Sequence, residues 1–297
     1  MRVIGFCDYE STELKDQIDV AKSLEIDQLL IRKINNLKVY EFDDALIKET
    51  NQILKSEKIS IVALDPLIKN YDLYDIEKFD EVLNMYEDAL NVASKLKVSN
   101  LYFRLPIIKD ILEEFDTVKS QLDLFIEMAR RFKITLLIKQ EEEKTNVLVY
   151  ILKKYRPRDL QLIFNPATTM TNEESPIVAY RLLKDYFNFF VSADIDKKNN
   201  PELLGYGRVK IIDIFKRMNR DQYKGFFILD DRFGNFVSGN EEKKVPWFKK
   251  LFKNKTNIDN YLRGYSLRIF PNQEVQDVTV FDIYENQINV LKIAFRL

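Results

Sequence analysis

One strand–helix–strand unit indicates how the chain is organised: residues 59–103 read ISIVALDPLIKNYDLYDIEKFDEVLNMYEDALNVASKLKVSNLYF. Its first run, residues 59–64, is apolar except for Ser60 and rich in β-branched residues, which predicts a strand buried on both faces. Apolar residues then recur at spacings of three and four from Phe79 to Leu96, which predicts a long amphipathic helix. A second short run, residues 101–103, predicts the next strand, so the unit is typical of a parallel sheet.

The same alternation continues along most of the chain. Further strand-like runs lie at residues 2–6, 28–31, 134–138, 160–164, 187–193 and 226–229, with helical spacing between them. Eight strand-then-helix units predict an α/β protein with a single (β/α)₈ TIM barrel over residues 1–264. A doubly wound open sheet is the alternative that this pattern leaves open. Three later strand-like runs, at 266–270, 278–283 and 288–295, predict a small C-terminal β extension over residues 265–297.

Composition excludes several kinds of chemistry. The 297 residues include no histidine, which excludes a Ser-His-Asp nucleophile and an imidazole base. Six of the seven glycines follow residue 204, so the first two-thirds of the chain has no glycine-rich phosphate loop. With 46 basic and 47 acidic residues, we expect neither a nucleic acid nor a membrane partner. The single cysteine, Cys7, suits the cytoplasm, and a homo-oligomer is left open.

Five segments together carry a family resemblance: residues 3–7 (VIGFC), 89–96, 134–138, 204–209 (LGYGRV) and 223–229 (YKGFFIL). In order and spacing they are similar to the xylose isomerase-like barrel superfamily, which includes sugar phosphate isomerases and epimerases and nucleases of the endonuclease IV type. The resemblance spans about residues 1–232. It implies a TIM barrel whose ligand, a carbohydrate or sugar phosphate, binds at the carboxyl ends of the strands.

The resemblance also implies a divalent metal ion at the ends of strands five to eight. Where the family has Glu, Asp, His and Glu, this chain has Lys139, Asn165, Ser192 or Ala193, and Asp230. A lysine places a positive charge where the ion belongs, and the remaining set is short of anionic ligands. We therefore predict that this metal site is absent and that no cofactor is bound. The zinc cluster of the endonuclease IV type is excluded as well, because it needs histidine.

Side chains that follow the strands of such a barrel point into its mouth. Arg32, Arg104 and Lys139 are predicted to converge there and to bind the carboxylate or phosphate of an anionic carbohydrate. The predicted substrate-binding set is completed by Asn165, Ser192 and Asp194. The predicted catalytic residues are Lys139, as a base or a Schiff-base amine, and Asp230, as a base. In the structural alternative, Lys139 pairs with Asp230 or with another carboxylate of the mouth.

Two functions remain open from the sequence. The first is a metal-independent, divergent sugar isomerase or epimerase, and the second is a non-catalytic ligand-binding or scaffold protein that keeps the barrel. Converging basic groups would favour the first, whereas a mouth closed by Phe, Tyr or an ion pair of Lys139 would favour the second. The segment Lys243–Lys255, with six lysines, is predicted as the last barrel helix or as a surface for anionic lipid or nucleic acid. The run Glu141–Glu143 is predicted as a solvated loop or as carboxylates for a relocated cation.

Overall fold

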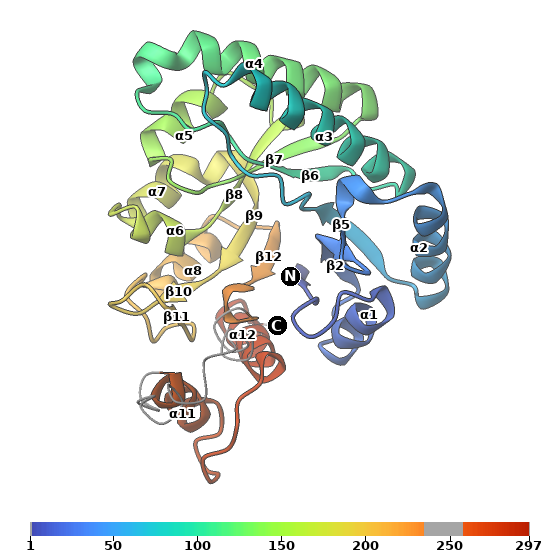
Figure 1. Cartoon of the computed structure of the whole chain (residues 1–297). Helices are drawn as coiled ribbons and strands as arrows, with labels where there is room; N and C mark the ends of the chain where they lie inside the picture. The colour runs from blue at the N-terminus through green and yellow to red at the C-terminus, as the bar shows by residue number, and fades with distance from the viewer. Residues whose placement is uncertain (1, 235–257, 297) are drawn as a thin grey trace, which may run out of the picture.

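Eight parallel strands close into a barrel in a computed structural model that describes residues 2–234 and 258–296 (Figure 1). Around the barrel the order is β1-β12-β9-β8-β7-β6-β5-β2, and β2 pairs with β1 to close it. The strands are β1 (Arg2–Phe6), β2 (Gln28–Ile31), β5 (Ser60–Leu64), β6 (Asn100–Phe103), β7 (Thr135–Lys139), β8 (Leu160–Phe164), β9 (Phe187–Ser192) and β12 (Phe226–Leu229). The predicted (β/α)₈ barrel is confirmed, and the open sheet is excluded.

Helices surround the strands on the outside (Figure 1). They are α1 (Leu14–Ser23), α2 (Asp44–Glu57), α3 (Ile76–Lys95), α4 (Ile111–Phe132), α5 (Thr145–Leu152), α6 (Pro166–Thr171), α7 (Pro176–Leu183), α8 (Ile211–Arg220) and α12 (Val280–Ala294). Helix α11 (Ile258–Ile269) lies further from the barrel strands (Figure 1). The two long helices α3 and α4 begin at aspartates, Asp75 and Asp110, whose side chains accept hydrogen bonds from backbone N–H groups of the first turn. No helix in the described ranges is long and apolar enough to cross a membrane.

Two short antiparallel pairs extend from the strand ends. β3 (Lys33–Ile34) pairs with β4 (Leu37–Lys38) after strand β2, and β10 (Asp194–Ile195) pairs with β11 (Pro201–Glu202) after strand β9. Helix α11 contacts the second pair, because the Tyr265 hydroxyl donates to the Pro201 carbonyl oxygen at 2.5 Å. These segments belong to the loops that follow the barrel strands, so they lie on the side of the mouth.

The predicted β extension over residues 265–297 is wrong, because α11 and α12 occupy these residues. Helix α12 buries Tyr284, Ile288 and Leu291 in the same core as the barrel strands, and it contacts β12 and α8. The spacing of these residues is helical, and Thr279 forms a capping box with Asp282 at the start of the helix. Helical periodicity therefore overrides the strand preference of the β-branched residues. The predicted helix at Lys243–Lys255 lies outside the described residues.

The barrel interior is filled by side chains below the mouth. Phe6 on β1 and Tyr102 on β6 lie on strands that are not neighbours, yet their ring centroids are 5.9 Å apart at an interplanar angle of 81°. Both residues are buried. Because side chains alternate along a strand, Asp8 and Arg104, each two residues further on, face the same interior one layer higher. This layer forms the mouth.

Candidate functional site

A ring of charged side chains forms the mouth at the carboxyl ends of the strands. Its members lie at or just beyond the ends of β1, β2, β5, β6, β7 and β12, and they are Asp8, Arg32, Asp65, Arg104, Lys139 and Asp230. A (β/α)₈ barrel gathers these side chains at one end, as predicted, because all eight strands end on the same side of it. What the ring can do depends on how the charges are paired.

The first group is centred on Asp65, which is 1% exposed. Arg104 donates to both of its carboxylate oxygens, at 3.0 and 3.1 Å, and the Lys139 Nζ atom lies 3.7 Å from Oδ2. Arg104 also donates from Nε to Glu141, at 3.0 Å. Burial raises the pKa of Asp65, but the two cations outweigh it and hold this pKa below the ordinary value. Arg104 and Lys139 thus neutralise one buried carboxylate together.

Arg32 belongs to a second group. It donates to both oxygens of Asp8, at 2.7 and 2.8 Å, and to Asp231 at 2.5 Å. Its guanidinium carbon lies 4.7 Å from the centroid of the Phe6 ring, in a cation–π contact. The binding of one anion by Arg32, Arg104 and Lys139 stays a prediction, and in the structure nearby carboxylates engage all three cations.

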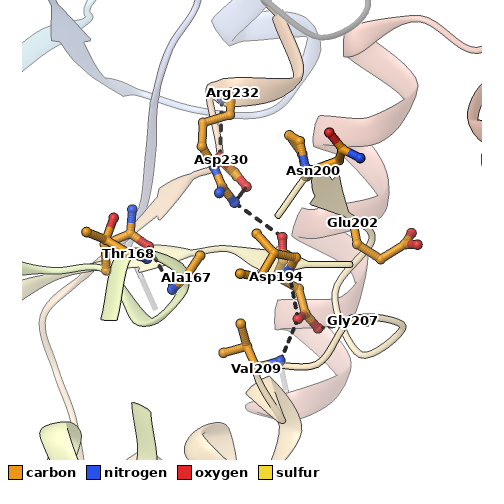
Figure 2. A network of polar contacts seen from close by, with 12 residues as sticks. Ala167, Thr168, Asp194, Asn200, Glu202, Gly207, Val209, Asp230 and Arg232 are labelled. Atoms are coloured by element: carbon orange, nitrogen blue, oxygen red, sulfur yellow. Dashed lines mark hydrogen bonds and ion pairs between the residues drawn. The ribbon is translucent and has the colours of Figure 1, made fainter. Parts of the chain in front are cut away.

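The third group joins the ends of β12 and β9 (Figure 2). Arg232 donates from Nε and Nη2 to the two oxygens of Asp230, at 2.8 and 2.5 Å, and from Nη2 to the Asp194 carbonyl oxygen at 3.2 Å. The Asp230 N–H in turn donates to Gln287 of α12, at 3.0 Å. Sequence reasoning missed Arg232, although an arginine two residues beyond a strand-end carboxylate was a readable signal. Asp230 is therefore engaged on both oxygens.

The Asp194 side chain organises the loop that follows β9. Its two oxygens accept four backbone N–H groups at 2.9–3.1 Å, from Ile195, Gly205, Gly207 and Val209 (Figure 2). Burial raises the pKa of Asp194, and these donors oppose the rise. We assign this carboxylate to the shape of the loop rather than to a ligand.

The structure also shows where the Asn165 and Ser192 side chains lie. The Asn165 side chain caps α6, because its Oδ1 accepts from the N–H groups of Ala167 and Thr168 at 3.0 and 3.3 Å. Phe190, two residues before Ser192, packs against Phe215 of α8 with ring centroids 6.0 Å apart. Strand alternation places Ser192 on this same outer face, so its buried hydroxyl points to the helix layer rather than to the mouth.

Of the two kinds of ion pair predicted for Lys139, the structure has the one with another carboxylate of the mouth, because the lysine pairs with Asp65 rather than with Asp230. The acidic run after β7 is also partly engaged. Glu141 pairs with Arg104, and Glu143 accepts the Glu141 N–H at 2.8 Å. Burial raises the pKa of Glu143 above its ordinary value. These contacts fold the run onto the rim of the barrel.

The donors at the four family metal positions fit a divalent cation poorly. Lys139 is a cation, both oxygens of Asp230 are bound by Arg232, and Asn165 caps a helix. A hard cation needs several free oxygen ligands around it. Within residues 2–234 and 258–296, no group of three or more His, Cys, Asp and Glu side chains is arranged to hold a metal ion.

Known structures share this barrel at low sequence identity. A D-psicose 3-epimerase from Clostridium cellulolyticum H10, solved with D-tagatose, covers 99% of this chain and 99% of its own, with 14% identity and a TM-score of 0.70. A xylose isomerase-like TIM barrel protein from Mycobacterium smegmatis, solved with magnesium, covers 99% and 96%, with 12% identity and a TM-score of 0.62. A sugar phosphate isomerase/epimerase from Parabacteroides distasonis covers 78% and 90%, with 14% identity and a TM-score of 0.59.

No protein-family model matches the sequence, and no curated protein matches it. The first two structural neighbours nevertheless cover nearly the whole of both chains, so the similarity includes the part of the chain that holds α12. The resemblance seen in the sequence is thus supported by the three-dimensional arrangement of the strands. The chain has the fold of the xylose isomerase-like TIM barrels.

Proposed function

We propose that the barrel binds an uncharged carbohydrate at its mouth, without a resident divalent metal ion and without isomerase chemistry. The observation that carries this proposal is the pairing of the strand-end charges: Arg104 and Lys139 engage Asp65, and Arg232 engages Asp230. These cations stand at the end of the barrel where the family holds its metal ion. They neutralise the carboxylates that an ion would need as ligands.

A carbohydrate fits both the fold and the mouth. The structural neighbours include proteins described as sugar epimerases and isomerases. Hydroxyl groups donate and accept hydrogen bonds, and a rim of alternating guanidinium and carboxylate groups offers both partners. Lys139 is 41% exposed, and its amine lies 3.7 Å from its carboxylate, so it can also donate to a ligand oxygen.

The charge of the mouth favours an uncharged ligand over the anionic one that the sequence predicted. Among the residues that the structure describes, four cations face five carboxylates there: Arg32, Arg104, Lys139 and Arg232 against Asp8, Asp65, Glu141, Asp230 and Asp231. An anion would have to displace a carboxylate from its guanidinium partner. Breaking a buried pair in this way costs several kcal/mol, because a charge is left without its partner.

The contacts also favour binding over catalysis. A general base must be free to accept a proton from the ligand, and Asp230 has both oxygens engaged. The alternative to be tested is a metal-independent isomerase in which the Lys139 amine forms a Schiff base with the sugar. The partial exposure of this side chain leaves its amine accessible to a ligand. Borohydride would trap such an adduct with a ketose as a stable increase in intact mass. We expect no increase.

We expect sugar binding to be independent of divalent metal. Calorimetric titration of the chelator-treated protein with D-tagatose, D-psicose and D-fructose should give the same affinity with and without added Mn²⁺. The corresponding sugar phosphates should bind no more tightly, because the described residues of the mouth carry no surplus of positive charge. Elemental analysis should find no stoichiometric metal. A well-occupied divalent ion at Asp230 and Asn165, or a failure of every sugar to bind, would contradict the proposal.

Replacing Lys139 with methionine is expected to separate binding from stability. The substitution should weaken sugar binding about tenfold, because a charge-assisted hydrogen bond to a ligand oxygen is lost. The free energy of unfolding should change by less than about 1 kcal/mol, since the amine is partly exposed and Arg104 still pairs with Asp65. Lys48→Met, on the exposed side of α2, is the matched control for both measurements. Equal affinities of the two variants would remove Lys139 from the site.

A further inference from the structure

The end of the barrel opposite the mouth carries cations that have no ionic partners among the residues that the structure describes. A cavity of about 480 Å³ opens there, where β7 and β8 begin, and it is lined by Arg130, Lys133, Ile134, Thr135, Arg158 and Asp159. Arg156 lies on the same turn as Arg158. The cavity is thus built from two segments, the end of α4 and the turn that leads into β8.

The turn that carries the two arginines is held firmly against β7. The Thr135 hydroxyl donates to the Arg158 carbonyl oxygen at 2.8 Å. The Leu136 N–H donates to the Asp159 carbonyl oxygen at 3.1 Å, and the Asp159 N–H donates to the Arg156 carbonyl oxygen at 2.9 Å. A fixed backbone limits the conformational entropy that a ligand would have to remove on binding.

The charges of the cavity do not cancel. Arg130 donates to both oxygens of Asp159, at 3.0 and 2.8 Å, and this pair is neutral. Lys133, Arg156 and Arg158 have no carboxylate within ion-pairing distance among the described residues. These charges lie close together, because Lys133 and Arg158 line the same cavity and Arg156 lies on the turn of Arg158, where its carbonyl oxygen accepts the Asp159 N–H. Three positive charges therefore remain at one place in a chain whose net charge is −1.

The end of α4 explains only part of this cluster. A helix carboxyl terminus attracts cations, which accounts for Arg130 in the last turn and for Lys133 just beyond it. Arg156 and Arg158 come after α5 has ended at Leu152, on a turn that lies outside a helix end. Their presence beside α4 therefore needs another reason.

We propose that this cavity binds a phosphate group, either as inorganic phosphate or pyrophosphate or as the phosphate of a small phosphorylated molecule. Guanidinium groups bind phosphate oxygens in pairs, and an ammonium adds a point charge. The lining offers one aliphatic residue, Ile134, and no aromatic ring on which a nucleic acid base would stack. The site is separate from the mouth, because it lies at the amino-terminal ends of the strands.

The chain supplies a matched control for Lys133. Both Lys133 and Lys58 end a helix in the left-handed conformation, with φ of 59° and 57°, and each directly precedes a residue that leads into a barrel strand. Only Lys133 lines the arginine-rich cavity. A change at Lys58 thus reproduces the local effect on the helix end without touching the proposed site.

Calorimetric titration with pyrophosphate at constant ionic strength tests the proposal. We expect saturable binding to the wild type, an affinity at least about tenfold weaker in Arg158→Gln and in Lys133→Gln, and an unchanged affinity in Lys58→Gln. Separate titrations with inorganic phosphate and with ribose 5-phosphate distinguish the free ion from a phosphomonoester. Thermal unfolding checks that each variant is folded.

Three results would overturn the proposal: no binding beyond that of a chloride-matched blank, equal losses in Lys133→Gln and Lys58→Gln, or full affinity in Arg158→Gln. Lys139→Met should bind pyrophosphate like the wild type. A loss confined to Lys139→Met would place the phosphate at the mouth and would overturn this inference together with the uncharged ligand proposed there. A failure of the sugars to bind would leave the phosphate cavity unaffected.

Discussion

Replacing Arg104 with methionine is expected to lower the free energy of unfolding by about 3–5 kcal/mol, the usual cost of leaving a buried charge without its partner. Asp65 is 1% exposed, and the two hydrogen bonds that its carboxylate accepts from side chains both come from Arg104. Lys139 makes only a longer ion pair with this carboxylate, with its amine 3.7 Å from Oδ2. Chemical denaturation at neutral pH measures the loss.

The same substitution should reverse the pH dependence that Asp65 contributes. In the wild type the pKa of this carboxyl is lowered, so its stabilisation is present at neutral pH and is lost as the pH falls through the folded-state value. Without Arg104, burial, which has the largest effect on this pKa, is opposed only by Lys139 and the Leu67 N–H. We expect burial to dominate and to raise the pKa, so that the folded state binds the proton more tightly than the unfolded state. The stability of the variant should then rise as the pH falls from 7 towards 5.

Lys95→Met is the control for this result. Lys95 pairs with Asp44 on the surface, where the side chains are 42% and 83% exposed, and exposed pairs contribute little. We expect a change below about 0.5 kcal/mol and no reversal with pH. If Arg104→Met costs no more than Lys95→Met, the Asp65 group does not stabilise the barrel end.

Most of the barrel could be predicted from the sequence, because parallel strands buried on both faces leave continuous apolar runs between helices of clear periodicity. The same continuous apolar character hides which side chains of a strand face the barrel interior. In β9 every side chain but Asn188 is buried, so the sequence does not reveal that Ser192 faces the helices. Residues at the strand ends could be predicted as a set, but not the direction of each one.

Apart from Asp230 and Arg232, which are two residues apart, the pairing of the mouth charges could not be predicted, because the partners are far apart in the chain. Arg32 pairs with Asp231, which is 199 positions away in the sequence, and Arg104 pairs with Asp65, which is 39 positions away. A list of strand-end cations suggests an anion site, whereas the folded chain supplies the anions itself. Whether a strand-end arginine is available to a ligand therefore depends on three-dimensional neighbours that the local pattern does not contain.

Replacing Gly207 with alanine is expected to lower the free energy of unfolding by about 3 kcal/mol, at the upper end of the usual cost of overpacking. A Cβ atom at this position would lie 2.1 Å from the Asp194 Oδ1 atom and 2.6 Å from the Ile195 carbonyl oxygen. Either the loop or the buried carboxylate must move, and hydrogen bonds between them would be lost. Gly264→Ala in α11 is the control, because a Cβ there meets nothing within 4 Å, and alanine should stabilise the helix by up to about 1 kcal/mol.

The effect of Gly207→Ala should reach the mouth through Asp194. This residue accepts the Gly207 N–H with its side chain and the Arg232 guanidinium with its backbone carbonyl oxygen, so one residue holds both the loop and the cation on Asp230. A displaced Asp194 loosens Arg232, and we expect sugar binding to weaken in Gly207→Ala and to stay unchanged in Gly264→Ala. Undiminished binding by a destabilised Gly207→Ala protein would show that the loop is independent of the mouth, because the Asp230–Arg232 pair would then keep its geometry without the support of Asp194.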